Sequence, residues 1–149
     1  MTVSMPLEDR LAIQDLMTAY CYAVDDMGNV EGILALFTED AVLDFSKIGL
    51  PVMHGQGDIR AFFERVFTDM SHHAHHIGNF RPEAYTGDTA EMSAYVIGLG
   101  RAKDGNEVTV HVQYRFGCLR TGAGWKCCEY SMFAMLPPPG SLEEIHGKR

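Results

Sequence analysis

The sequence lacks the features that direct a chain to a membrane or to nucleic acid. Its N-terminal stretch, MTVSMPLEDR, has no basic segment followed by an apolar one, so no secretory signal is predicted. No apolar run approaches the roughly 20 residues that are needed to cross a bilayer. The formal net charge of −8 also disfavours anionic surfaces, because like charges repel. We therefore expect neither nucleic acid nor a membrane as a partner.

The sequence lacks the cysteine and glycine patterns that bind metals and cofactors. The four cysteines include no CxxC pair. Neither a zinc site nor a disulfide framework is therefore predicted, and we expect reduced thiols in a cytoplasmic protein. Gly98-Leu-Gly100 is followed by Arg101 and by no helix, so this segment is not a dinucleotide-binding loop. The sequence predicts no metal and no cofactor.

What is present is the composition of an ordinary globular domain. The chain has 149 residues, of which 46% are hydrophobic and 21% charged, and it contains no repeat, low-complexity tract or linker. A chain of this length can bury a core without disulfides or metal. We therefore expect one domain that spans residues 1–149.

Three helices are predicted in the first half of the chain. Apolar residues recur at steps of three and four in Arg10–Met27, which Gly28 and Asn29 terminate. Asn29 can cap a short helix over Val30–Phe37. A dense apolar stripe then marks a third helix over Asp58–Met70.

Strands are predicted before and after the third helix. A short strand over Ala41–Phe45 precedes a loop over Ser46–Gly57. From Ser71 onward apolar residues alternate, and glycine-rich turns separate four long strands. These are expected over His73–Tyr85, Thr89–Lys103, Glu107–Thr121 and Trp125–Leu136.

This order of elements predicts an α+β fold. Three N-terminal helices pack on a strongly curved, mixed but mainly antiparallel sheet, and together they form a cone with an interior pocket. The tail Ser141–Arg149 follows a proline run and is either loose or lies across the mouth of the cone.

One carboxylate is placed against ordinary electrostatics. Asp25 lies in the last turn of the first predicted helix, where the helix dipole disfavours a negative charge by about 0.3–1 kcal/mol. It also lies at the edge of the apolar stripe rather than on the solvent face. We infer that Asp25 holds a histidine, although a solvated residue at a frayed helix end would have the same position.

A cluster of four histidines offers that partner. In a strand only alternate residues share a face, so His73 lies with His75, and His72 lies with His76. Neither pair has an obvious third ligand for a zinc ion. A turn with exposed imidazoles is the alternative interpretation, which suits His72 and His73 best.

Four stretches of the chain resemble the nuclear transport factor 2-like superfamily and, within it, the SnoaL-like group. Their order and spacing carry the resemblance, which extends from about Leu7 to Leu136. The chain looks most like scytalone dehydratase, bile acid 7α-dehydratase and hexachlorocyclohexane dehydrochlorinase. The stretches are AIQDLMTAYCYAVDDMGNVEGILALFTEDAVLDF, HGQGDIRAFFERV, HHAHHIGNFRPEAYTGDTAEMSAYV and GAGWK.

This resemblance implies a catalytic group of three residues. Asp25 corresponds to the aspartate at the end of the first helix, His76 to the histidine on the strand after the third, and Tyr20 to a tyrosine of the dehydratases. A neutral imidazole can remove a proton from carbon next to a carbonyl group, and a carboxylate on its other nitrogen fixes the tautomer. Tyr20 would donate to a developing oxyanion, unless it is simply a core aromatic residue.

The resemblance also implies which residues bind the substrate. Val112 and Tyr114 correspond to small polar pocket residues of scytalone dehydratase, so the substrate contacts must differ here. A further histidine of that enzyme has no counterpart, because the matching segment offers only Tyr95. The expected substrate-binding residues are Phe63, Tyr95, Val112, Tyr114 and Tyr130.

The expected function is that of a cofactor-independent, dehydratase-like lyase acting on a small apolar cyclic or aromatic-type hydroxy or keto compound. An isomerase or cyclase is the catalytic alternative, and an isomerase of the ketosteroid type would use Asp44 or Asp40 as its base. Because one fold serves many functions, a ligand-binding module and a structural subunit, such as the small subunit of ring-hydroxylating dioxygenases, are further alternatives. His111 and Arg115 are expected to face another copy in a homodimer or homotrimer, through the outer sheet face.

Overall fold

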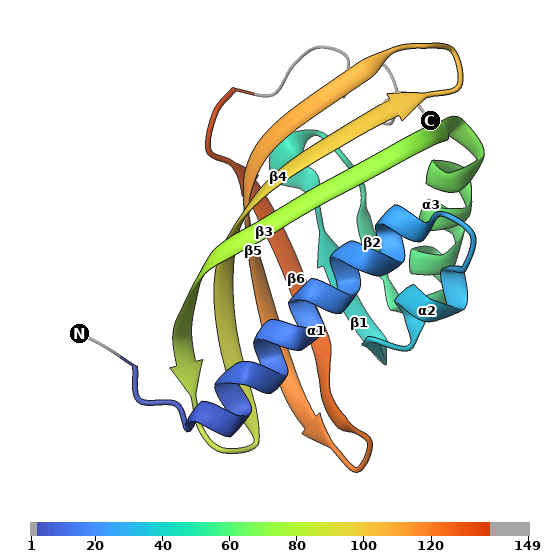
Figure 1. Cartoon of the computed structure of the whole chain (residues 1–149). Coiled ribbons are helices and arrows are strands. Elements are labelled where there is room, and N and C mark those ends of the chain that lie inside the picture. Colours follow the sequence, from blue (N-terminus) through green and yellow to red (C-terminus); the bar gives the residue numbers. More distant parts are fainter. Residues whose placement is uncertain (1–2, 138–149) are drawn as a thin grey trace.

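The computed structural model describes residues 3–137, which form helices packed on one six-stranded sheet (Figure 1). The predicted tail Ser141–Arg149 lies outside the described residues. Among the described residues, no helix combines the length and apolar character needed to cross a membrane. The helices are α1 (Leu7–Asp26), α2 (Val30–Leu34), the 3-10 helix η1 (Ser46–Ile48) and α3 (Gly55–Asp69). The strands are β1 (Phe37–Asp44), β2 (Val52–His54), β3 (Met70–Tyr85), β4 (Thr89–Ala102), β5 (Glu107–Thr121) and β6 (Gly124–Ala134).

The predicted α+β class is confirmed, and the elements differ from the prediction mainly around β1. Helix α2 ends at Leu34 rather than Phe37, because the chain is already extended in β1 from Phe37 onward. Part of the predicted loop forms β2, which pairs antiparallel with β1. Helix α3 begins earlier than predicted, at Gly55, whose φ of 82° suits a residue without a side chain.

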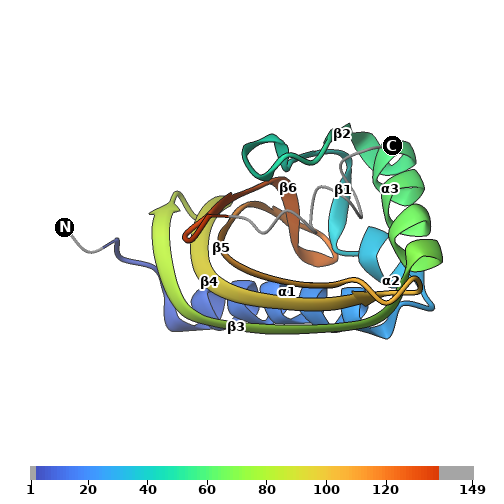
Figure 2. The same ribbon diagram turned by 90° about the horizontal axis from the view of Figure 1, so that it is seen from above.

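The sheet is mixed and remains open. Its strand order is β2-β1-β6-β5-β4-β3, and only the β1–β6 pair is parallel. Figure 2 shows β3, β4 and β5 bending around one side of the molecule, while α3 and β2 lie on the other. We call the face of the sheet that packs against the helices the inner face, and the opposite one the outer face.

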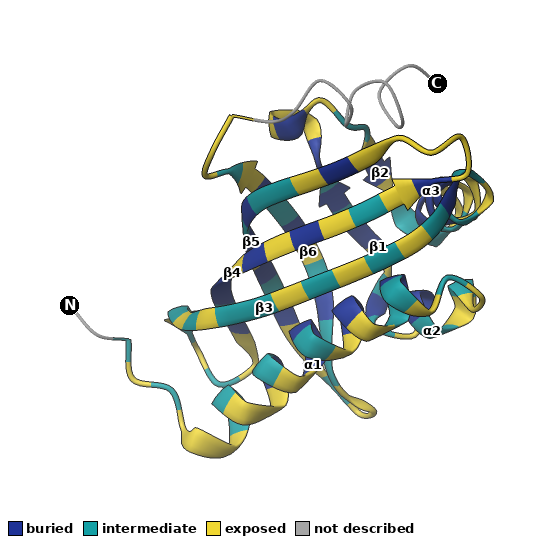
Figure 3. Ribbon diagram, turned by 45° about the horizontal axis from the view of Figure 1, so that its top comes forward, coloured by how far each residue is buried: buried dark blue, intermediate teal, exposed yellow. Residues whose placement is uncertain are grey.

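The core lies between the inner face and the helices. Figure 3 shows buried and exposed positions alternating along β4, as expected for a sheet with one covered face. The centre of the core is a group of aromatic rings that contact one another edge to face or in tilted pairs. The group consists of Tyr20 from α1, Phe37 from β1, Tyr114 and Phe116 from β5, and Tyr130 from β6.

Three bulges in β3 determine which of its side chains point inward. The register of β3 on β4 shifts between Met70 and His72, between Gly78 and Arg81, and between Pro82 and Ala84. Asn79, inside the second bulge, has a left-handed φ of 51°, a conformation that asparagine tolerates better than most residues. Each bulge changes the pairing by one residue, and the first two lie on either side of the histidine cluster, so they set its neighbours on β4.

Candidate active site

Asp25 binds His75 through both of its carboxylate oxygens. Oδ1 accepts a hydrogen bond from Nδ1 of the His75 ring at 2.5 Å, and Oδ2 accepts one from the backbone N–H of His75 at 2.9 Å. Both side chains are largely buried, with exposed fractions of 15% for His75 and 27% for Asp25. These two bonds offset the unfavourable position of Asp25 at the C-terminal end of α1. Asp25 therefore holds a histidine, as inferred from its position.

The predicted partner, His76, is the wrong one. His76 pairs with Ile97 across the β3–β4 ladder, and Ile97 pairs in turn with His111. Directly opposed residues share a face of the sheet, and Ile97 is exposed on the outer face. The ring of His76 therefore points away from Asp25. The register between the bulge after Met70 and the bulge after Gly78 turns the other pair, His73 and His75, to the inner face.

Two glycines on β4 provide the space for the inward imidazoles. His75 pairs with Gly98, and His73 pairs with Gly100. A Cβ atom on Gly98 would lie 3.3 Å from both Cδ2 and Nε2 of His75, and one on Gly100 would lie 3.3 Å from Cδ2 of His73. The segment Gly98-Leu-Gly100 therefore seats two rings side by side. It is the signal in the sequence that could have identified the correct histidine.

An apolar cavity of about 110 Å³ opens beside His75. Of the residues predicted at the site, Tyr20, Phe63, Val112 and Tyr114 line it. One wall comes from the short segment around η1, which contributes Phe45, Ile48 and Leu50. The inner end of β3 contributes His73 next to His75.

Two predicted pocket residues do not line the cavity. Tyr95 is 45% exposed and pairs with Gly78 and Gln113 on the outer face, so it is not a cavity residue of this protein. The resemblance placed Tyr95 at the site because the matching segment of scytalone dehydratase carries a histidine, but the resemblance does not fix the face of β4 on which Tyr95 lies. Tyr130 is buried behind the lining, with its ring 5.1 Å from that of Tyr20 and 5.0 Å from that of Tyr114.

The phenols beside the cavity are held in their protonated form. Burial raises the pKa of Tyr20, Tyr114 and Tyr130 well above the ordinary value. The hydroxyls of Tyr20 and Tyr114 lie near enough to affect the pKa of Tyr130. Among the described residues, however, none meets the geometry of a hydrogen bond to the buried Tyr130 hydroxyl. Tyr20 and Tyr114 can therefore act as hydrogen-bond donors toward a ligand in the cavity.

Cys21 lies one helical turn before Asp25 and stays a neutral thiol. Burial, together with the negative charge of Asp25, raises its pKa to about 12. A nucleophilic role needs a thiolate, and so Cys21 is a packing residue. Within residues 3–137, no group of three or more His, Cys, Asp or Glu side chains is arranged to hold a metal ion.

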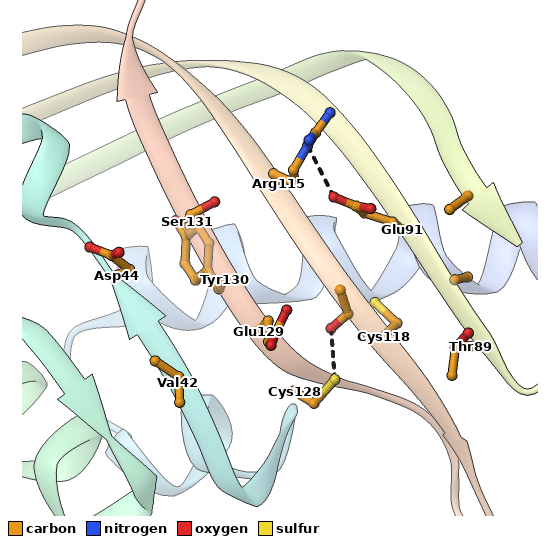
Figure 4. A pocket seen from close by; sticks show the side chains of 13 residues that line it. Val42, Asp44, Thr89, Glu91, Arg115, Cys118, Cys128, Glu129, Tyr130 and Ser131 are labelled. Atoms are coloured by element: carbon orange, nitrogen blue, oxygen red, sulfur yellow. Dashed lines mark hydrogen bonds and ion pairs between the residues drawn. The ribbon is translucent and has the colours of Figure 1, made fainter.

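A larger hollow, of about 630 Å³, lies on the outer face of the sheet (Figure 4). It is open and lined by both polar and apolar residues, and Arg115, one of them, binds Glu91 at 3.2 Å. Asp44 also lines it and accepts hydrogen bonds from the hydroxyl and backbone N–H of Ser46, which lower the pKa of Asp44. Asp44 and Asp40 lie away from the inner cavity, because neither contributes to its lining. A base of the ketosteroid isomerase type at either position is therefore not supported.

The inner cavity, rather than the outer hollow, has the features of a reaction site. It combines an imidazole oriented by a carboxylate with neutral phenols in apolar surroundings. Because a carboxylate can only accept, Nδ1 of His75 carries the proton that binds Asp25, and Nε2 of the neutral ring is left as a base. The arrangement can take a proton from a bound molecule and stabilise the negative charge that develops on it.

The helices and the mixed sheet form the nuclear transport factor 2-like fold. The chain belongs to the SnoaL-like family, whose model matches residues 5–131. A comparison with curated proteins finds no match.

Several solved structures share the whole architecture. A provisionally assigned aromatic ring hydroxylase from Novosphingobium aromaticivorans is 51% identical, with a TM-score of 0.93, over 95% of this chain and 99% of that one. A provisionally assigned scytalone dehydratase from the same organism is 20% identical, with a TM-score of 0.79, over 87% of this chain and 86% of that one. The type 3 hexachlorocyclohexane dehydrochlorinase from Novosphingobium barchaimii is 20% identical, with a TM-score of 0.76, over 90% and 92%. At 20% identity these last two matches show the shared fold alone.

Proposed function

We propose that this protein is a cofactor-independent lyase that removes water from a small cyclic hydroxy ketone. The observation that carries this proposal is the His75–Asp25 pair at the wall of an apolar cavity. The cavity of about 110 Å³ is smaller than the cavity of about 150 Å³ that accommodates one benzene ring in another protein, so it favours a substrate of a single ring and its lining must widen to admit one. The dehydratase and dehydrochlorinase that share the fold have names that imply elimination.

The elimination begins with proton transfer to His75. Nε2 takes a proton from the carbon next to the substrate carbonyl, and the electron pair of the broken C–H bond forms an enolate. Asp25 stabilises the imidazolium that results, as a carboxylate does in a catalytic triad. Tyr20 and Tyr114 line the cavity and donate hydrogen bonds to the enolate oxygen.

Departure of the hydroxyl group completes the reaction. The enolate re-forms the carbonyl, its electrons form a carbon–carbon double bond, and the C–O bond at the β carbon breaks. The imidazolium of His75 returns its proton to the departing hydroxide, which leaves as water. His75 is neutral again at the end, so no other reactant is consumed.

The proposal can be tested with 3-hydroxycyclohexanone, whose dehydration gives cyclohexenone, an enone that absorbs in the ultraviolet. We expect the protein to accelerate enone formation and His75→Gln to reduce the rate by about 10²–10⁴-fold, the usual contribution of a general base. His76→Gln is the matched control on the outer face and should keep the full rate. Equal rates for His75→Gln and the unaltered protein would show that His75 is not the base.

A second candidate function is that of a non-catalytic subunit of an enzyme that acts on aromatic rings, since the 51% identical protein is provisionally assigned as an aromatic ring hydroxylase. In that case the cavity would either be an empty space in the core or bind a ligand without converting it. Constant co-purification with a larger oxygenase chain, and no enone formation by the isolated protein, would support this candidate.

We also propose that copies of the chain associate through the outer face of the sheet, as a homodimer or homotrimer. Exposed apolar side chains lie together there, because Tyr95 and Phe133 both flank Gln113 in the ladder and Ile97 lies on the same face. Replacing Tyr95 and Ile97 by serine should produce monomers in analytical ultracentrifugation. Monomers at every concentration of the unaltered protein would contradict this assembly.

A further inference from the structure

Two imidazoles of β3 point inward. The proposed reaction uses that of His75 and assigns no role to that of His73. The ring of His73 lines the same cavity as that of His75. The two ring centroids are 5.7 Å apart, and the rings are inclined by 77°. His73 is therefore close enough to contact the molecule on which His75 acts.

The hydrogen bond that Nδ1 of His73 makes determines whether the other ring nitrogen, Nε2, is a donor or an acceptor. Nδ1 lies 3.2 Å from the backbone oxygen of Val24, in α1. A carbonyl oxygen has no proton to give, so Nδ1 must be the donor. The second nitrogen, Nε2, then carries a lone pair in the neutral ring. Among the described residues it has no hydrogen-bond partner.

The surroundings of His73 keep the ring neutral and in place. Burial lowers its pKa below the ordinary histidine value and outweighs the raising effect of the Val24 carbonyl, while His75 lowers the pKa and Asp25 raises it by smaller amounts. The ring rests on Gly100, where any Cβ atom would lie 3.3 Å from Cδ2. A fixed, neutral imidazole beside an apolar cavity offers a hydrogen-bond acceptor and no donor.

We propose that Nε2 of His73 accepts a hydrogen bond from a hydroxyl group of the ring substrate and so makes the site selective for hydroxylated rings. This inference rests on the proposed function in one respect, that the inner cavity is the substrate site. A ring that carries a methyl group or halogen in place of the hydroxyl would leave the acceptor buried without a partner, and should bind about tenfold more weakly. His73 is thus a specificity residue, while His75 is the base.

Phenol and toluene are suitable probes, because they differ only in a hydroxyl against a methyl group. Binding of each to the full chain can be measured by calorimetry and by chemical shifts. We expect phenol to bind about tenfold more tightly than toluene. His73→Phe should abolish that preference by weakening phenol binding alone. The matched variant His75→Phe, over Gly98, should keep the preference.

A second measurement makes the test independent of any variant. In the unaltered protein, the ¹⁵N resonance of Nε2 of His73 should shift as phenol saturates the cavity and stay in place with toluene. The inference is overturned if that resonance does not move, if neither ring binds, or if the preference survives in His73→Phe and disappears in His75→Phe. The outcomes also separate the two proposals. If His73→Phe loses the phenol preference but the unaltered protein forms no enone, the lyase alone is refuted. If the unaltered protein forms the enone but shows no phenol preference, the role of His73 is refuted.

Discussion

Helix α1 carries a carboxylate near each end, and the two are used in different ways. Asp9, in the first turn, accepts hydrogen bonds from Tyr85 at 2.6 Å, Arg120 at 2.8 Å and Trp125 at 3.2 Å. Among residues 3–137, Asp25, in the last turn, accepts hydrogen bonds from His75 alone, through the ring and the backbone.

The two carboxylates differ in whether a group that binds them keeps an unpaired atom beside the cavity. The dipole of α1 favours a negative charge at Asp9 and disfavours one at Asp25. The hydrogen bonds from Arg120 and Tyr85 lower the pKa of Asp9 to about 2, and Arg120 also stacks on the Trp125 ring at 4.4 Å. At Asp25 the partner is an imidazole with a second nitrogen beside a cavity. Asp9, in the favourable position, fastens the helix to the sheet, whereas Asp25, in the unfavourable position, orients the imidazole that we propose as the base.

The largest difference between the two ends should appear in Asp25→Asn and Asp9→Asn. An asparagine at position 25 can donate to Nδ1 of His75 and so stabilise the tautomer whose Nε2 carries the proton, which cannot act as a base. We expect enone formation by Asp25→Asn to fall by about 10²–10⁴-fold. Asp9→Asn should retain the rate below its unfolding temperature. Equal losses in both variants would mean that Asp25 acts only through stability.

A smaller effect is expected from one added methyl group at Gly98. The new Cβ in Gly98→Ala would lie 3.1 Å from Cγ2 of Val110 and 3.3 Å from the His75 ring, so that the ring must move. We expect the rate to fall by about tenfold, because a misplaced base loses its alignment. Gly122→Ala is the control, since a Cβ there meets nothing within 4 Å. An unchanged rate in Gly98→Ala would show that the seat of the ring tolerates a side chain.

At the other end of α1, acid should remove a contribution to stability. The folded-state pKa of Asp9 is depressed from 3.8 to about 2. Its contribution is therefore complete above the unfolded value and is lost as the pH falls through about 2. Asp9→Asn should lower the melting temperature at pH 7, and the gap to the unaltered protein should close between about pH 4 and pH 2. Thermal unfolding followed by circular dichroism at a series of pH values measures both melting temperatures. A difference between them that stays constant with pH would contradict the stabilising role of the Asp9 carboxylate.

The smallest effect is expected from Trp125→Phe. This change removes one of the three donors to Asp9 and keeps an aromatic ring beneath Arg120. The melting temperature should fall less than in Asp9→Asn, because Tyr85 and Arg120 still bind the carboxylate. Enone formation should not change. A fall as large as that of Asp9→Asn would mean that Trp125 stabilises the fold through packing rather than through Asp9.

Local patterns in the sequence were sufficient for most of the fold. The period of apolar residues in α1 and α3 and the alternation after Ser71 gave the helices and long strands within a few residues. Strand β2, of three residues, was missed, because so short a segment has no period of its own. It exists through its pairing with β1.

The site was predicted only in part, because its geometry depends on long-range register. The unfavourable position of Asp25 indicated a histidine partner, and alternation correctly separated His73 and His75 from His72 and His76. Which pair points inward follows from the bulges in β3, and Gly98 and Gly100, opposite the inward rings, are the signal of it in the sequence. Tyr95 was misplaced because the resemblance did not fix the face of β4 on which it lies.

The wall of the cavity formed by the segment around η1 has a consequence for how such sites diversify. Phe45, Ile48 and Leu50 belong to a short connection held by a few backbone hydrogen bonds, whereas His75 and Asp25 belong to a long strand and a long helix. Remodelling that connection would change the volume of the cavity and admit bulkier ligands, while the His75–Asp25 pair stayed in place. In the function that we propose, chemistry and substrate size are therefore encoded in separate parts of the chain, and each can change without the other.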